Sequence, residues 1–180
     1  LNCIPRRYNP LPMSSPMRLL FVCYANLIRS PLAENLFRRL TEEKGLEGKY
    51  ACDSAGTSVY SPGAPPHPTM RETAELHGVA LTGRARPFQP EDFNRFDLIL
   101  AADKDVAADL RGWAPGEGSR ARIRLLTEFG PKGTRTGIPD PYGGGTAAFE
   151  TTYQTVERSV RGLLEWLEAG SPSTSAHRRG

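Results

Sequence analysis

The sequence LLFVCYANLIRSPLAENLF, at residues 19–37, places a strand, a loop and a helix in direct succession. Its apolar run at residues 19–22 is typical of a parallel strand that is buried on both faces. After the loop, Leu32, Leu36 and Leu40 recur at helical spacing, and Gly45 is placed to end the helix. This stretch therefore predicts the opening unit of an α/β fold.

The same alternation continues along the chain. Further strands are predicted at residues 50–52, 96–101 and 123–126, and further helices at residues 69–77 and 105–110. A last helix, ending at Gly170, carries Phe149, Tyr153, Val156 and Val160 on one side. Strands that alternate with helices favour a parallel sheet. We therefore predict a three-layer α/β/α fold with a central four-stranded parallel sheet and helices on both faces.

Composition predicts one globular domain flanked by two tails. Of 180 residues, 38% are hydrophobic and 24% are charged, which is typical of a globular chain with a sizeable core. Residues 1–16 are rich in proline and residues 171–180 are polar, and neither stretch has hydrophobic periodicity. We expect a disordered leader and a disordered tail around one globular domain at residues 17–170.

Charge and cysteine content narrow the class of partner and the compartment. A net charge of only +3 does not demand nucleic acid or a membrane as partner. No apolar run approaches the roughly 18 residues of a membrane span, and no signal peptide is visible. Three cysteines without framework spacing argue against a disulfide-stapled secreted domain, so a cytoplasmic location is expected.

The loop after the first strand has the features of an anion site. Ligands in such folds bind beyond the carboxyl ends of the strands, where Cys23 stands. Backbone N–H groups and the dipole of the following helix can cradle a phosphate, and the same field favours a nucleophilic thiolate. Arg29 can grip two phosphate oxygens with its planar fork. The predicted phosphate-binding residues are Tyr24, Ala25, Asn26, Leu27, Ile28, Arg29 and Ser30.

Two of these residues also have an ordinary structural explanation. A lone cysteine after a buried strand is more often a small core residue, and Ser30 is equally compatible with a helix N-cap. The spacing from Cys23 to Arg29, with Ser-Pro opening the helix, favours the anion site. Nucleotide-binding glycine fingerprints are absent from this loop. The Ser30 hydroxyl could also donate a hydrogen bond to the sulfur.

Four segments, in order along the chain, resemble the low-molecular-weight protein tyrosine phosphatase family. VCYANLIRSPLAE at residues 22–34 is similar to the active-site loop of that family. The other three are DSAGT at 53–57, DFNRFDLILAAD at 92–103 and IPDPYGG at 138–144. With the last helix, the resemblance covers about residues 18 to 168. It implies a phosphatase whose nucleophile is Cys23, whose phosphate clamp is Arg29 and whose proton donor is Asp140.

The resemblance also implies roles around these three residues. Tyr24, Tyr60 and Tyr142 match positions that line the cleft, where they would make it deep enough to select phosphotyrosine over phosphoserine. Asn26 and Ser54, with Ser30, match residues that support the loop, Asn26 in a left-handed conformation. A histidine often joins that support in the family, and Gly83 takes its place here.

Two residues inside the loop depart from the family pattern. Ala25 replaces a usual glycine, which would cost on the order of 1 kcal/mol if the position needs a positive φ. Ile28 replaces the usual second cysteine, which can form a disulfide with the nucleophile and protect it from over-oxidation. We therefore expect this chain to lack a reversible redox switch.

The predicted function is hydrolysis of phosphotyrosine in proteins through a phosphocysteine intermediate. No cofactor and no metal are expected, because no His/Cys cluster has ligand spacing. The expected partner is a phosphotyrosine protein substrate, and the chain is expected to be a monomer or weak dimer. Two alternatives remain: a non-catalytic phosphotyrosine-binding or regulatory protein, and an arsenate reductase, for which only Cys3 and Cys52 could carry electrons.

Overall fold

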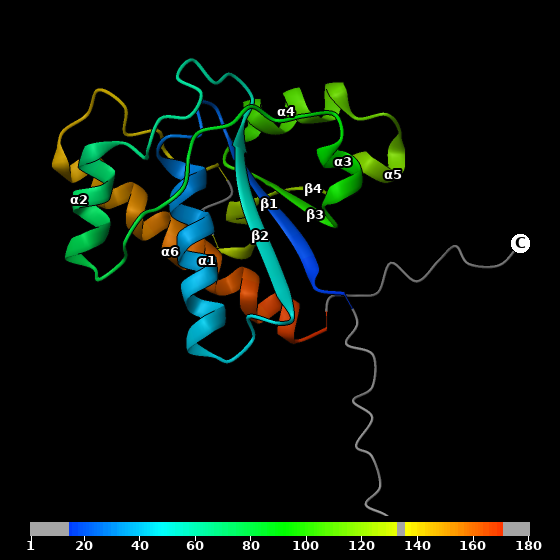
Figure 1. The fold of residues 1–180 in the computed structure, drawn as a ribbon, viewed down its shortest axis with the longest axis horizontal. Coiled ribbons are helices and arrows are strands. Elements are labelled where there is room, and N and C mark those ends of the chain that lie inside the picture. Colours follow the sequence, from blue (N-terminus) through cyan, green and yellow to red (C-terminus); the bar gives the residue numbers. More distant parts are fainter. Residues whose placement is uncertain (1–14, 133–135, 171–180) are drawn as a thin grey trace, which may run out of the picture.

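The computed structural model describes residues 15–132 and 136–170 (Figure 1). Its centre is a four-stranded sheet in the order β2-β1-β3-β4, and every neighbouring pair is parallel. The strands are β1 (Met17–Cys23), β2 (Tyr50–Gly56), β3 (Leu98–Ala101) and β4 (Ile123–Leu125). The long apolar runs at β1 and β3 follow from this position, since the two inner strands are covered on both faces.

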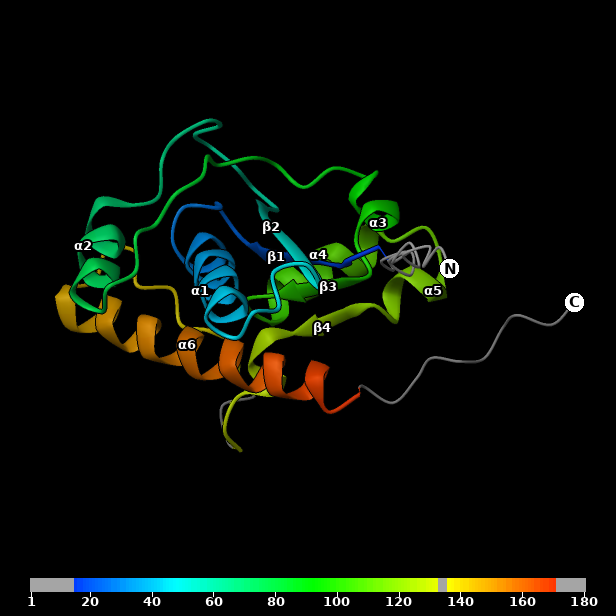
Figure 2. The ribbon, with the colours of Figure 1, turned by 60° about the horizontal axis from the view of Figure 1, so that its bottom comes forward.

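Two separate cores cover the two faces of the sheet. One core joins Leu19 and Phe21 of β1 to the helices α1 (Arg29–Glu43), α2 (Pro68–Leu76) and α6 (Thr146–Glu168). The other joins Leu20 and Val22 to α4 (Lys104–Trp113) and to the short α3 (Asp92–Arg95). Figure 2 shows α6 running along α1 and α2 on one side of the sheet. The predicted three-layer α/β/α fold with helices on both faces is confirmed.

The predicted elements are all present, with differences at their ends. β2 extends to Gly56 beyond the predicted 50–52, and β3 begins at Leu98 rather than at residue 96. Leu126 belongs to a 3-10 helix, η1 (Leu126–Phe129), and not to β4. Three short elements were not predicted: α3, α5 (Glu117–Arg120) and η1. Each has four residues, which is too short to show a hydrophobic period.

The ordered elements run from Met17 to Glu168. Most of the predicted leader at residues 1–16 and the whole predicted tail at 171–180 lie outside the described residues, so those boundaries stay predictions. In the part of the chain that the structure describes, no helix has both the length and the apolar character needed to cross a membrane.

Candidate active site

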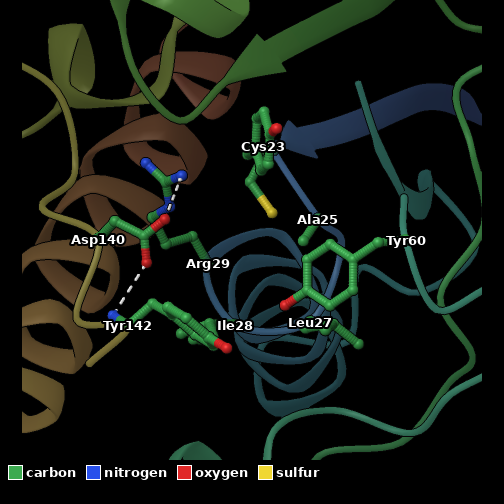
Figure 3. A pocket seen from close by; sticks show the side chains of 9 residues that line it. Cys23, Ala25, Leu27, Ile28, Arg29, Tyr60, Asp140 and Tyr142 are labelled. Carbon is green, nitrogen blue, oxygen red and sulfur yellow. Dashed lines mark hydrogen bonds and ion pairs between the residues drawn. The ribbon is translucent and has the colours of Figure 1, made fainter. Parts of the chain in front are cut away.

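A cavity of about 270 Å³ opens beyond the carboxyl end of β1 (Figure 3). It is lined by Cys23, Tyr24, Ala25, Leu27, Ile28, Arg29, Tyr60, Asp140 and Tyr142. The sulfur of Cys23 points into it, with Arg29 and Asp140 on one side and Tyr60 on the other. Parallel-sheet topology produces this convergence, because the loops that follow the strands meet at one edge of the sheet.

Hydrogen bonds from neighbouring segments to its carbonyl groups hold the loop between Cys23 and α1 in place. The carbonyls of Cys23, Tyr24 and Leu27 accept hydrogen bonds from the backbone N–H groups of residues 57, 58 and 67. With these carbonyls turned outward, the loop N–H groups are left for an anion at its centre. The first turn of α1 adds positive potential there.

Gly56 explains why the DSAGT segment carries a glycine beside the loop. A Cβ at this position would lie 2.7 Å from the carbonyl oxygen of Tyr24 and 2.7 Å from Cγ2 of Val59. Both distances are shorter than a real Cβ contact. The end of β2 can therefore pack against the loop that follows β1 only if residue 56 has no side chain.

Two expectations about the loop backbone are corrected. Asn26 has φ 56° and is the non-glycine residue with positive φ in the described chain, as the resemblance implied. Ala25 does not have a positive φ, so its methyl group adds no strain of the kind anticipated. Helix α1 begins at Arg29 with Ile28 at the N-cap, so Ser30 is not a cap residue. Its hydroxyl lies 3.0 Å from the sulfur of Cys23 instead.

Arg29 is buried and is fixed by two carboxylates. Its Nη1 donates to Oδ2 of Asp103 at 2.5 Å and to the carbonyl oxygen of Ile138 at 3.2 Å. Its Nη2 donates to Oδ2 of Asp140 at 2.9 Å. These contacts hold the guanidinium beside the loop rather than in solvent, where a planar donor fork can meet a phosphate.

Asp140 reaches the cavity from a segment more than a hundred residues after the loop. It lies between η1 and α6, flanked by Pro139 and Pro141, which restrict the backbone. Its Oδ1 accepts the backbone N–H of Tyr142 at 3.1 Å, and its side chain is 45% exposed. A carboxyl group in this setting is positioned, yet still open to a ligand.

Three tyrosines stand around the mouth of the cavity. Tyr24, Tyr60 and Tyr142 are 51%, 59% and 67% exposed, although all three line the cavity wall. Burial, followed by the neighbouring Tyr142, Asp140 and Cys23, raises the pKa of Tyr60. Aromatic rings with this exposure offer free faces to a planar aryl group.

The loop support contains the predicted residues and one further carboxylate. Asn26 Nδ2 donates to the hydroxyl oxygens of Ser30 at 2.9 Å and of Ser54 at 3.0 Å. The histidine that the resemblance implies beside Ser54 is replaced by Gly83, which has no side chain to offer. The Ser54 hydroxyl donates to Glu34 at 2.6 Å instead, so Ser54 still has an acceptor.

Sequence reasoning missed Asp103 and Glu34. Asp103 follows the end of β3 at the carboxyl edge of the sheet, and that position was the available signal. Glu34 gave no signal, because a glutamate in an amphipathic helix usually faces solvent. Residues 15–132 and 136–170 contain no group of three metal-ligating side chains that could hold a metal ion.

Comparison with known proteins agrees with this geometry. Residues 18–172 match the low molecular weight phosphotyrosine protein phosphatase family. The low molecular weight protein-tyrosine-phosphatase of Streptomyces coelicolor is 40% identical over 149 residues, covering 82% of this chain and 91% of the relative. The human low molecular weight phosphotyrosine protein phosphatase is 38% identical over 148 residues, covering 82% and 93%.

Solved structures show the same likeness. A protein tyrosine phosphatase from Entamoeba histolytica superposes with a TM-score of 0.82 at 35% identity, covering 86% of this chain and 98% of that chain. YfkJ from Bacillus subtilis superposes with a TM-score of 0.81 at 34% identity, covering 88% and 98%. On this evidence the chain belongs to the low molecular weight phosphotyrosine protein phosphatase family.

Proposed function

We propose that this chain hydrolyses phosphotyrosine in proteins through a phosphocysteine intermediate on Cys23. The observation that carries the proposal is the meeting of Cys23, Arg29 and Asp140 in one cavity. A thiolate, a fixed guanidinium and a positioned carboxyl group are the nucleophile, clamp and acid that metal-free phosphoryl transfer requires.

The first step is the attack of the Cys23 sulfur on phosphorus. The loop N–H groups and Arg29 bind the equatorial oxygens and balance their charge. Because the incoming phosphate competes for the donors of Arg29, it displaces Asp140 from Nη2 while Asp103 keeps Nη1. Once released from that ion pair, the Asp140 carboxylate takes up a proton from solvent. It gives this proton to the departing phenolic oxygen, and the P–O bond breaks as the S–P bond forms.

The second step hydrolyses the phosphocysteine and regenerates the free thiolate of Cys23. Asp140, now a carboxylate, takes a proton from a water molecule, and the water oxygen attacks phosphorus. The S–P bond breaks, the electron pair stays on Cys23, and inorganic phosphate leaves. The Ser30 hydroxyl, 3.0 Å from the sulfur, stabilises the departing thiolate by donating a hydrogen bond to it.

The cavity walls support an aryl substrate. Tyr60 and Tyr142 stand at the mouth and Leu27 lines the interior, so a phosphotyrosine ring is covered on its faces while its phosphate reaches the loop. A phosphoserine side chain is too short to place its phosphate on the loop without forcing its backbone between these rings. Phosphotyrosine proteins in the cytoplasm are the proposed substrates, and a monomer or weak dimer is the proposed form.

Hydrolysis of a simple aryl phosphate, without metal or thiol donor, tests the function. The proposal predicts turnover by the wild-type chain and its loss in Cys23→Ser, with binding of phosphotyrosine peptide retained. A binding module would bind the peptide but show no turnover in either protein. An arsenate reductase would turn over arsenate with a thiol donor, a reaction for which Cys52 is poorly placed, since it pairs with Leu19 rather than lying near Cys23.

A further inference from the structure

Thr152 differs from its neighbours on α6 in where its hydroxyl group bonds. A threonine or serine hydroxyl in a helix usually donates to the carbonyl oxygen four residues earlier, as is found here for Thr151, Thr155 and Ser159. The Thr152 hydroxyl instead leaves the helix and donates to the carbonyl oxygen of Pro139 at 3.0 Å. Thr152 is 0% exposed, so water competes little for this bond. A buried hydroxyl of α6 is therefore used to hold the segment that carries Asp140.

The segment between η1 and α6 offers few backbone donors around Asp140. Pro139 and Pro141 have no N–H, so the backbone on either side of the aspartate presents carbonyl oxygens only. The segment is docked before this point by the N–H of Ile138, which donates to the carbonyl oxygen of Ala102 at 2.7 Å. The bond from Thr152 is the tie that follows, and it falls on the carbonyl group directly before Asp140.

The place of this bond in the chain decides what it controls. The proline ring fixes φ of Pro139 at about −65°, and Pro141 restricts the backbone of the aspartate that precedes it. The torsion that remains is ψ of Pro139, whose rotation tilts the peptide group between residues 139 and 140. That group is planar, so the carbonyl oxygen of Pro139 and the Cα of Asp140 move together. A hydrogen bond to this oxygen therefore sets the direction in which the carboxyl group projects.

The other contacts around Asp140 do not replace this bond. The contact of its carboxylate with Nη2 of Arg29 is the one that the substrate phosphate displaces in the proposed mechanism. The N–H of Tyr142, which bonds to Oδ1, belongs to the same segment and moves with it. Arg29 also donates to the carbonyl oxygen of Ile138 at 3.2 Å, but that oxygen lies before Pro139 and leaves its ψ free to rotate.

We propose that Thr152 is a positioning residue for the general acid, acting through Pro139 to keep the carboxyl group of Asp140 aimed at the departing oxygen. This inference rests on the proposed function and extends its site to α6. When phosphate takes over the donors of Arg29, the peptide group before Asp140 stays in place, because its tie comes from the helix and not from the cavity. The same carboxyl group then meets the leaving oxygen in the first step and water in the second from one position.

Thr152→Val tests the inference, because it removes the hydroxyl group and keeps the shape of the side chain. The value of kcat/KM for phenyl phosphate should fall about tenfold, a part of the roughly 10²–10⁴-fold that a general acid contributes. For p-nitrophenyl phosphate the loss should be about threefold or less, since nitrophenolate leaves without a proton. Inhibition by inorganic phosphate should not weaken, because the loop and Arg29 are unchanged. A folding defect alone would lower both rates equally and leave their ratio at the wild-type value.

Thr155→Val is the matched control, because it makes the same substitution on α6 at a hydroxyl that bonds within the helix. It should keep the wild-type ratio of the two substrates, and Thr152→Ser, which restores the donor, should return the ratio toward that value. Thr152→Ala takes the place of Thr152→Val if the valine variant does not fold.

A wild-type ratio in the variant without the Thr152 hydroxyl, measured beside an active wild-type chain, would overturn this inference and leave the proposed function standing. Absence of turnover of both aryl phosphates by the wild-type chain would overturn the proposed function, and this inference with it.

Discussion

Asp103 and Asp140 hold Arg29 from two sides, and they differ in what else they do. Asp103 also accepts the backbone N–H of Val106 and thereby caps α4, so it belongs to the framework. Asp140 is nearly half exposed, and among the residues that the structure describes its carboxylate bonds to Arg29 and to the N–H of its own turn. At the scale of residues, Asp103 therefore holds Arg29 in place, whereas the carboxyl group of Asp140 is free to act on the substrate.

Removing the charge of Asp103 tests whether this residue positions the guanidinium of Arg29. Asp103→Asn keeps a good cap residue for α4 but weakens the hold on Arg29. Losing a charged hydrogen bond of about 1.5–3 kcal/mol predicts a fall of about 10- to 100-fold in kcat/KM for an aryl phosphate. Competitive inhibition by inorganic phosphate should weaken as well. Wild-type kinetics in this variant, with an unchanged melting temperature, would show that Asp103 does not position the clamp.

Asp140→Asn tests the proton donor. The loss in kcat should be about 10²–10⁴-fold, because the amide cannot protonate the leaving oxygen. The loss should be larger for phenyl phosphate than for p-nitrophenyl phosphate, since nitrophenolate can leave without a proton. An equal loss for the two substrates would mean that Asp140 only supports Arg29.

Oxidation by peroxide tests the prediction that the chain lacks a reversible redox switch because residue 28 is isoleucine and not cysteine. Cys52 pairs with Leu19, four residues before Cys23 on β1, which places the two cysteines about 13 Å apart along the strands. A disulfide needs Cα atoms about 4.4–6.8 Å apart. Burial also raises the pKa of the Cys52 thiol to about 12. Cys52 is therefore both too distant and too poor a thiolate to rescue Cys23.

In a Cys3→Ser background, peroxide should inactivate the chain with little recovery after thiol treatment. Ile28→Cys restores a thiol inside the same cavity and should make most of the lost activity recoverable, as measured by aryl phosphate hydrolysis before and after reduction. Full recovery without the added cysteine would contradict the prediction.

At the scale of elements, α6 approaches η1 so closely that one of its residues must be glycine. A Cβ on Gly162 would lie 1.8 Å from the carbonyl oxygen of Phe129, which is backbone and cannot swing away. Gly112 in α4 offers the contrast, because a Cβ there would meet nothing within 4 Å.

The pair of glycines makes a matched stability test. Gly162→Ala forces α6 away from η1 and should lower the free energy of unfolding by about 1–3 kcal/mol or more. Gly112→Ala should leave it unchanged or raise it by about 0.5–1 kcal/mol, since alanine is the better helix residue. Urea titration of both variants measures the difference, and equal effects would mean that the α6–η1 contact is not tight.

The long elements could be predicted from the sequence because each buries a face with its own period. The apolar runs of β1 and β3 and the stripe of α6 read directly as strands and helix. The three four-residue elements were missed, since one turn carries no period. Cys23, Arg29 and Asp140 could be named from their motifs, but Glu34 and Asp103 became visible only once folding had placed Ser54 and Arg29 beside them.

At the scale of the whole molecule, buried phenol and thiol groups predict a loss of stability in alkali. Burial, followed by nearby Glu157, raises the pKa of Tyr153 to about 12, and burial raises that of Cys52 to about 12. In the unfolded chain these groups titrate near 10 and 8.5. Their contribution is complete below those values and is lost as pH rises toward 12, because the unfolded state gives up its protons first.

The free energy of unfolding, measured by urea at a series of pH values from about 8 to 12, should therefore fall with increasing pH. The double variant Tyr153→Phe, Cys52→Ala should show a smaller slope, whatever its stability at neutral pH. A slope equal to that of the wild-type chain would mean that other groups govern alkaline unfolding.

The most direct test of the whole account is the identity of the atom that carries phosphate during turnover. Rapid denaturing quench during hydrolysis of an aryl phosphate, followed by peptide mass spectrometry, locates that atom. A phosphocysteine mechanism predicts one phosphoryl group on the peptide that contains Cys23, and none in Cys23→Ser. Phosphate on another residue, or turnover that persists in Cys23→Ser, would contradict it.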